Sequence, residues 1–144
     1  MPFDQKRLHH FIYTIDIDAE PKKVWTVLTD VSRWHVWDTE LKSAQLDDVF
    51  RLHATGKLIP KKGPELPFII TQLEEGKGYT FRTDMPIGHL LIQRTLSSKN
   101  GKTHFTDDIQ FTGGLKYLFG LILGRSFQKV LPEVMHNFKQ LAES

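Results

Sequence analysis

Asp107 is the acidic side chain whose position best suits proton transfer. It shares its parity with the apolar positions of segment 103–112, where apolar and polar residues alternate, so it is predicted to face inward. Burial raises the pKa of a carboxyl group and is costly unless the charge is paired. Three interpretations are open: an acid in a pocket, a salt bridge with Arg94 or Arg82 on a neighbouring strand, or a bulge that turns the side chain outward.

His89 is the histidine best placed to meet a ligand. It lies at the start of a predicted strand, directly after Pro86-Ile87-Gly88. In a cavity, an imidazole with an ordinary pKa near ~6.5 can act as acid or base, or hydrogen-bond a ligand carbonyl or hydroxyl. The alternative is a strand-edge residue that faces water. His89 and Asp107 are therefore the candidate catalytic residues.

Patterns for metal, cofactor and nucleophile chemistry are missing. The chain has no cysteine, which excludes disulfides, thiolate catalysis and cysteine-ligated clusters. Its 7 histidines show neither H-x-H nor H-E-x-x-H spacing. The stretch around Ser126 lacks the last glycine of G-x-S-x-G and lies in a predicted helix. We expect no metal and no cofactor.

The composition is that of a globular protein without a strong electric field. The 144 residues are 40% hydrophobic and 25% charged, and the net charge of +2 gives no reason to expect nucleic-acid binding. The densest apolar stretch, 115–123, contains Lys116 and is far shorter than the ~20 residues that a membrane span needs. No apolar signal segment follows the first residues. We expect a cytoplasmic protein of one domain over 1–144, with no particular oligomeric state indicated.

The first 41 residues predict a strand followed by two short helices. Segment 8–17 alternates apolar and polar residues, as a half-buried strand does. Asp18 is placed to cap a helix that tolerates Pro21 in its first turn and ends near residue 30. Segment 31–41 then places Trp34 and Trp37 on one side, three residues apart.

Six further strands and a long helix follow. The candidate strands are 42–48, 51–59, 67–74, 79–84, 88–97 and 103–112. Short turns join them, and Asn100-Gly101 is a strong signal for a two-residue hairpin, so an antiparallel meander is expected. From Leu115 to Leu141 the apolar residues form one stripe, which predicts a helix that Pro132 kinks or splits. The order of elements is α+β, with this helix covering the concave face of the sheet.

Several residues together resemble a known superfamily. They are Pro21, Val24-Trp25, Leu28-Thr29-Asp30, Trp34, Trp37-Asp38, Gly56, Pro60, Gly63-Pro64 and Phe111-Thr112-Gly113. With the long final helix, they resemble helix-grip proteins of the START/Bet v 1-like (SRPBCC) superfamily, in the polyketide cyclase/dehydrase and lipid-transport branch. The resemblance implies a curved antiparallel sheet of about seven strands around the C-terminal helix. It also implies a cavity between them for a hydrophobic or aromatic small molecule.

That cavity sets the expected ligand-binding residues and the leading hypothesis for function. The expected residues are Trp37, Tyr79, Phe81, Met85, His89, Phe105, Phe119 and Phe127. Binding would come mainly from burial of apolar ligand surface, with one or two polar groups to orient the ligand.

Two alternatives remain open. One is a cyclase or dehydratase in which His89 or Asp107 moves a proton in the same cavity. The other is an interaction module, like the quinone-binding chaperones and the ribosome-associated toxin among the similar proteins. Its docking surface would be the exposed side of the last helix, which carries Lys116, Arg125, Lys129 and Lys139.

Overall fold

The fold is a seven-stranded antiparallel sheet with helices on one of its faces. The computed structural model describes residues 10–85, 88–113 and 116–144, and their side chains except those of residues 85 and 116–128. The elements are β1 (His10–Ile17), α1 (Pro21–Leu28), the 3-10 helix η2 (Val31–Arg33), α2 (Trp34–Trp37), β2 (Leu41–Leu46), β3 (Thr55–Pro60), β4 (Leu66–Glu74), β5 (Gly78–Met85), β6 (Gly88–Lys99), β7 (Lys102–Thr112) and α3 (Lys116–Glu143). The predicted order of elements is confirmed.

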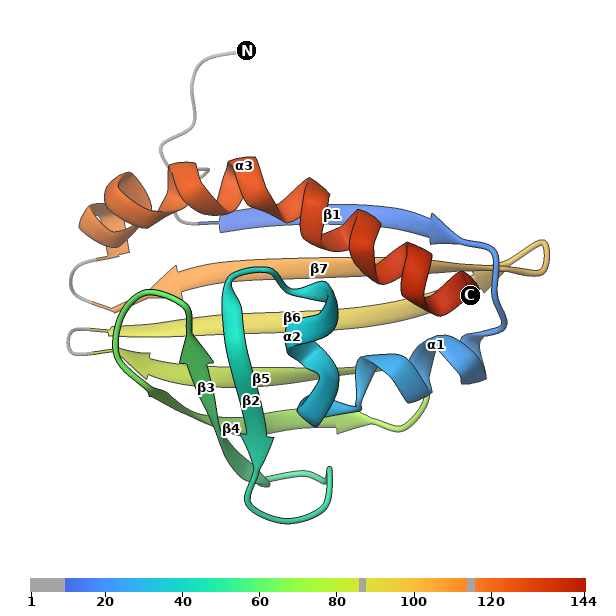
Figure 1. The fold of residues 1–144 in the computed structure, drawn as a ribbon, viewed down its shortest axis with the longest axis horizontal. Helices are drawn as coiled ribbons and strands as arrows, with labels where there is room; N and C mark the ends of the chain where they lie inside the picture. Colours follow the sequence, from blue (N-terminus) through green and yellow to red (C-terminus); the bar gives the residue numbers. More distant parts are fainter. Residues whose placement is uncertain (1–9, 86–87, 114–115) are drawn as a thin grey trace.

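The strands pair in the order β1-β7-β6-β5-β4-β3-β2, so β2 to β7 form the predicted meander. The strand β1 does not pair with β2, because the short helices carry the chain across the sheet and leave β1 beside β7. Figure 1 shows β2 and β3 running across the direction of β4 to β7, which curls the sheet around α1, α2 and α3. This is the helix-grip arrangement, with an inner face toward the helices and an outer face toward solvent.

The turn between β6 and β7 follows from its two residues. Asn100 and Gly101 have φ angles of 55° and 78°. Two positive φ angles in succession are what a type I′ hairpin turn requires. The hairpin holds β6 and β7 in register over their whole length, so that Arg94 lies directly opposite Asp107.

Several predicted strand boundaries differ from the observed ones, and the largest difference is at the start of β3. The strand predicted over 51–59 begins at Thr55, because His53 adopts a φ of 68° that no strand residue has. The chain turns at this point, and the His53 backbone N–H donates to the Ile70 carbonyl of β4. The strand predicted over 42–48 runs from Leu41 to Leu46, and the connection to β3 begins at Asp47.

Pro132 does not split the last helix, which continues from Lys116 to Glu143. An interior proline costs about 3 kcal/mol because it removes one backbone hydrogen bond and crowds the preceding turn. Burial on either side of it favours one continuous helix, because the apolar residues there face the sheet. The buried side chains of this half are Leu131, Val134, Met135, Phe138 and Ala142.

Aromatic rings fill the described part of the interior. Trp34 packs against Phe68, Tyr79 and Phe81, with ring centroids 5.8, 6.3 and 5.3 Å away. Phe138 of α3 packs against Trp37 and Phe105 at 4.9 and 4.7 Å. Through these contacts α2, the sheet and α3 form one apolar core. A charged side chain inside this core is therefore an exception that needs an explanation.

Candidate functional site

A positively charged side chain lies in the middle of the inner face. Along β6 the inward positions are Leu90, Ile92, Arg94 and Leu96, and Arg94 is only 3% exposed. A guanidinium cannot lose its proton in a protein, so this charge needs compensation where it lies. Arg94 and the side chains around it are therefore the candidate functional site in the described part of the chain.

Three aromatic rings enclose the Arg94 guanidinium. Its central carbon lies 4.8 Å from the ring centroid of Trp34, 4.9 Å from that of Trp37 and 5.2 Å from that of Phe81. The two tryptophans come from the short helices after β1, where a spacing of three residues turns both toward the sheet. Attraction between a cation and aromatic faces is strongest when water is excluded. The rings thus stabilise the charge without pairing its N–H groups.

Two oxygen-bearing side chains on the neighbouring strands contact Arg94. Asp107, opposite it on β7, places Oδ1 3.6 Å from Nε, an ion pair that is too long for a hydrogen bond. Tyr79, opposite it on β5, accepts from an Arg94 Nη1–H at 3.2 Å. The Tyr79 hydroxyl donates in turn to the Leu28 carbonyl at 2.8 Å, which fixes the end of α1 over this site.

The environment shifts the pKa values of this cluster in a consistent way. Burial raises the pKa of Asp107 to about 6, against the opposing effect of Arg94. Burial also raises the pKa of Tyr79 to about 12 and that of Asp38, which follows α2. For Arg94, burial acts downward, but Tyr79 and Asp107 outweigh it and raise the pKa above its usual range. Arg94 is charged and Tyr79 protonated at neutral pH, whereas Asp107 titrates close to it.

Several buried polar atoms of the inner face have no hydrogen-bond partner in the described part of the chain. Three of them lie in the cluster: Arg94 Nε, Asp107 Oδ1 and Trp37 Nε1. The fourth, Thr83 Oγ1, lies further along the inner face of β5, two inward positions beyond Tyr79. A buried donor or acceptor without a partner costs about 1–3 kcal/mol, so native proteins keep few of them. Three of the four lie beside one charge, so most of this cost falls on the cluster around Arg94.

The expected ligand-binding residues fall into three groups. Trp37, Tyr79, Phe81 and Phe105 are buried on the inner side, and the first three belong to the cluster around Arg94. The side chains of Met85, Phe119 and Phe127 lie outside the described residues. His89 is the exception.

His89 lies on the outer face, exposed, and does not meet Asp107. Alternation along β6 turns it opposite to Arg94, because the two are an odd number of residues apart. Its Nδ1 lies 2.7 Å from Asp84 Oδ1, which gives it a partner at the surface. The expectation of a ligand-facing His89 is corrected by this parity, and the two candidate catalytic residues do not converge.

Sequence reasoning underrated Arg94. The sequence indicates it only as one of two possible salt-bridge partners for Asp107, and in the structure Arg94 is the partner, whereas Arg82 pairs with Asp84 on the outer face. The signal was present, because Arg94 is the single charged residue among the inward positions of its strand. Thr83 and Asp38 carried no comparable signal.

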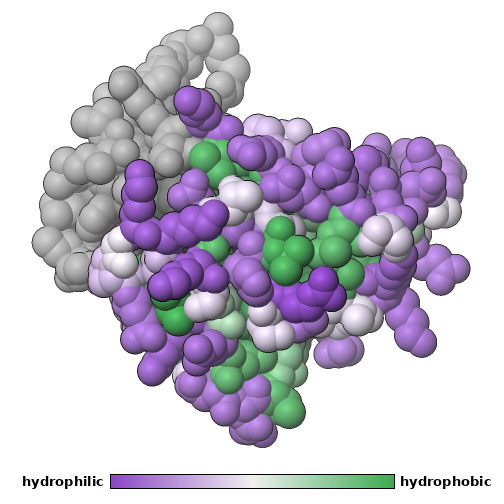
Figure 2. Space-filling model, in the orientation of Figure 1, coloured by the Kyte–Doolittle hydropathy of each residue, from purple (hydrophilic) through white to green (hydrophobic). Residues whose placement is uncertain are grey.

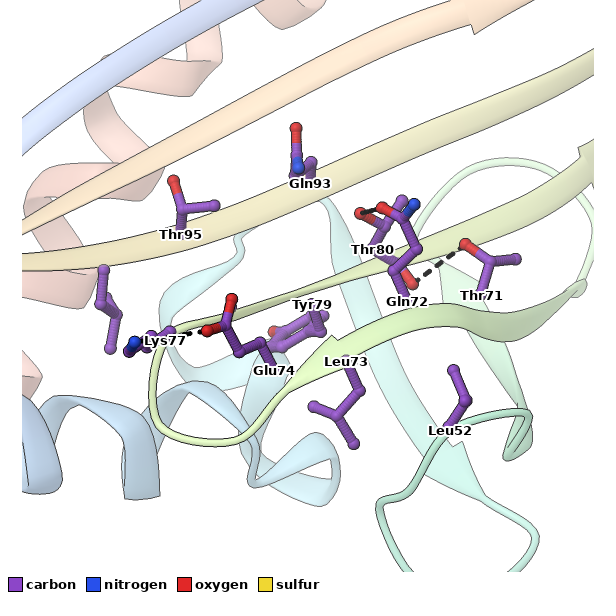
Figure 3. A pocket seen from close by; sticks show the side chains of 12 residues that line it. Leu52, Thr71, Gln72, Leu73, Glu74, Lys77, Tyr79, Thr80, Gln93 and Thr95 are labelled. Carbon is purple, nitrogen blue, oxygen red and sulfur yellow. Dashed lines mark hydrogen bonds and ion pairs between the residues drawn. The ribbon is translucent and has the colours of Figure 1, made fainter.

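A separate depression of about 640 Å³ lies mainly over the outer face of β4, β5 and β6. Some of its polar side chains are paired with their neighbours, as Figure 3 shows: Thr80 Oγ1 donates to Gln72 Oε1 and Lys77 binds Glu74. Thr71 donates to the Thr80 backbone carbonyl at 3.3 Å. The depression is open to solvent and part of its polar lining is already paired, so it has weaker grounds for ligand binding than the inner face.

The described surface is mostly polar. Figure 2 shows hydrophobic side chains gathering at the surface between α1 and the C-terminal part of α3, and over the β2–β3 connection, which carries the exposed Val49 and Leu52. On α3, Lys139 is held by Glu143, while the side chains of Lys116 and Arg125 lie outside the described residues. Among the described residues, no His, Asp and Glu side chains gather in a group of three that could hold a metal ion. No helix in the same residues has the length and hydropathy to cross a membrane.

Known structures share this fold. A protein from Mesorhizobium loti is 14% identical and superposes with a TM-score of 0.74, covering 92% of this chain and 95% of that one. A START superfamily protein from Mycobacterium smegmatis is 11% identical, with a TM-score of 0.71 and coverage of 92% and 99%. The di-domain ARO/CYC StfQ from the steffimycin biosynthetic pathway is 10% identical, with a TM-score of 0.73, and the match covers 96% of this chain and 51% of StfQ.

Comparison of the sequence with known families gives evidence that is independent of the solved structures. No curated protein matches this chain significantly. The family described as polyketide cyclase/dehydrase and lipid transport matches residues 9–143, nearly the whole chain. Together with the helix-grip fold and the START-like structures, this match shows that the chain belongs to the polyketide cyclase/dehydrase and lipid transport family.

Proposed function

We propose that this protein binds a small apolar molecule against the inner face of its sheet, with one polar group of that molecule at Arg94, Asp107 and Trp37. The observation that carries the proposal is the set of three buried, unpartnered polar atoms around a caged guanidinium. Family membership supports it, because lipid transport and polyketide chemistry both require an apolar molecule to be held by the protein.

Stability alone does not account for this cluster. A buried ion pair is often no more stabilising than apolar residues of similar size, because both charges lose their hydration. Here the pair is also separated by 3.6 Å, so neither Nε nor Oδ1 gains a hydrogen bond from it. A ligand group that hydrogen-bonds to Nε and Oδ1 would offset the free-energy cost of burying them unpaired, so the cluster is better explained by ligand binding than by stability.

Native mass spectrometry of freshly purified protein tests the proposal. We expect a bound small molecule in the wild type and its loss in the double variant Arg94→Met/Asp107→Leu, which removes both charges together. The control is Gln93→Ala, the neighbouring residue on the outer face. Equal occupancy of a bound molecule in wild type and double variant, or its loss in Gln93→Ala alone, would contradict the proposed site.

One observation favours a second candidate, acid–base catalysis in the same place. The pKa of Asp107 is raised to about 6 by burial, and a general acid or base works best when its pKa is near the working pH. His89 takes no part, since it faces outward. In this case Asp107→Asn keeps the co-purified molecule bound but stops its conversion, and turnover that survives in Asp107→Asn excludes the role.

A further inference from the structure

We infer that the polar group received by this cluster is an uncharged hydroxyl, so that the ligand is an apolar molecule bearing a neutral alcohol or phenol. The inference rests on the proposed function and goes on to specify its ligand. It follows from the kinds of atom that lack partners. Arg94 Nε–H and Trp37 Nε1–H are donors, and Asp107 Oδ1 is an acceptor.

The three atoms belong to Arg94 and to two side chains that each contact it. Arg94 Nε lies 3.6 Å from Asp107 Oδ1, and the Trp37 ring centroid lies 4.9 Å from the guanidinium carbon. Since both partners lie against the same guanidinium, we expect one oxygen atom of a ligand beside Arg94 to reach all three side chains. A hydroxyl accepts through two lone pairs and donates one hydrogen, which satisfies two donors and one acceptor.

Other common polar groups leave part of the cluster unsatisfied. At pH 7.5 the Asp107 carboxyl is mostly ionised, so a ketone or ether, which only accepts, leaves Oδ1 unpartnered. A carboxylate also only accepts, and it brings a negative charge next to Asp107, with Asp38 acting on the same Arg94. An ammonium group only donates and lies against the Arg94 charge. The remaining member of the surroundings, Tyr79, is occupied, since its hydroxyl already donates to Leu28 and accepts from Arg94.

The two caging tryptophans provide a matched pair of variants. Both are 1% exposed and both face Arg94. Trp34 Nε1 donates to the Leu28 carbonyl at 2.9 Å, whereas Trp37 Nε1 has no partner in the described part of the chain. Replacing either by phenylalanine keeps an aromatic ring, so only the variant at Trp37 removes a donor that is available to a ligand.

Equilibrium dialysis at pH 7.5 with 2-naphthol, 2-methoxynaphthalene and 2-naphthoate tests the inference. The three share an aromatic body and differ in the polar group. We expect 2-naphthol to bind about tenfold more tightly than either analogue, because both leave Asp107 Oδ1 unpartnered. In Trp37→Phe this advantage falls about fivefold, and in Trp34→Phe it persists.

The outcomes separate the inference from the proposed function. If 2-methoxynaphthalene binds as tightly as 2-naphthol, the hydroxyl inference is overturned, because a retained water then serves the three atoms, while binding of an apolar molecule stands. Tightest binding of 2-naphthoate, or an equal loss of the advantage in Trp34→Phe and Trp37→Phe, also overturns it. Failure of all three compounds to bind rejects both the inference and the proposed function.

Discussion

Arg94 and Asp107 depend on each other energetically, since each would otherwise be an isolated charge on the inner face. Replacing Arg94 by methionine leaves the Asp107 carboxyl without its counter-ion, and removal of one member of a buried pair costs about 3–5 kcal/mol. We therefore expect Arg94→Met to lower the free energy of unfolding by about 3 kcal/mol at pH 8. The double variant Arg94→Met/Asp107→Leu should lose less than Arg94→Met alone. Urea denaturation of the wild type, both single variants and the double variant measures this coupling.

The double variant decides between coupling and independence. If its loss equals the sum of the two single losses, the residues act independently and the ion pair has no energetic meaning. Gln93→Ala, one residue away on the outer face, is the control and should change the unfolding free energy by less than about 0.5 kcal/mol.

The raised pKa of Asp107 predicts a pH dependence of stability with a definite sign. Its pKa is about 6 in the folded protein and 3.8 when unperturbed, so the folded state holds this proton more strongly. The contribution is fully present below about pH 4 and is lost as the pH rises through 6, a change of about 3 kcal/mol. Arg94, Tyr79 and Asp38 face the same cluster and are present in every variant compared.

Comparing the wild type with Asp107→Asn isolates this effect. Asparagine does not titrate, so the wild-type unfolding free energy minus that of Asp107→Asn should fall by about 3 kcal/mol between pH 4 and pH 7. Asp48→Asn is the control, because Asp48 is exposed in the β2–β3 connection and pairs there with the exposed Arg51. A difference for Asp107→Asn that stays constant, or that rises with pH, contradicts the assignment.

The sequence predicts those features of the site that depend on the spacing of residues within one strand or one helix. The inward position of Asp107, its possible pairing with Arg94, and the burial of Trp37 all follow from alternation or helical spacing. The indole of Trp37 and the guanidinium of Arg94 lie together only because α2 packs over β6, which is a tertiary contact. Periodicity holds no information about that contact, so the cluster as a whole could not be predicted.

At the scale of elements, Gly56 lets β3 lie close to the strands on both sides of it. A Cβ atom at this position would collide with the Gln45 carbonyl of β2 and with the Phe68 ring of β4. We expect Gly56→Ala to lower the free energy of unfolding by about 3 kcal/mol, because backbone and a packed ring must both move. Phe68 contacts Trp34, so near-ultraviolet circular dichroism should change as well.

A glycine in the β4–β5 turn is the control for this prediction. Gly76 has a φ of 79° and open space around it, so Gly76→Ala carries only the conformational cost of about 1 kcal/mol. If Gly56→Ala is no more destabilising than Gly76→Ala in urea, the close approach at β3 is not a constraint on the fold.

The elements themselves were predictable where local patterns were strong. Alternation identified β1 and β7, and Asn100-Gly101 identified the hairpin between β6 and β7. The extent of α3 was predicted correctly, and of the two effects expected of Pro132, a kink or a split, the split does not occur, because burial of Phe138 and its neighbours outweighs the local cost of the proline. The start of β3 was missed because the left-handed His53 has no glycine-like signature in the sequence.

At the scale of the molecule, the curled sheet has an inner and an outer face that differ in character. Successive side chains of each strand point to one face and then to the other. The outer face presents polar side chains that are already paired, such as His89 with Asp84 and Thr80 with Gln72. The inner face is mostly apolar, and its buried polar residues are the cluster around Arg94, Thr83, and Thr103, which donates to the Ala19 carbonyl. The account depends on this contrast, since it assigns binding to the inner face and not to the outer depression.

The most direct test is a ¹H–¹⁵N spectrum of the three tryptophan indole groups during addition of 2-naphthol. Trp25 and Trp34 already donate to Glu75 and Leu28, whereas Trp37 Nε1–H has no partner in the described part of the chain. The account predicts that the Trp37 signal, assigned with Trp37→Phe, moves furthest and that the Trp25 signal stays in place. An unmoved Trp37 signal, with shifts at the side-chain amides of Gln72 and Gln93 instead, would contradict it.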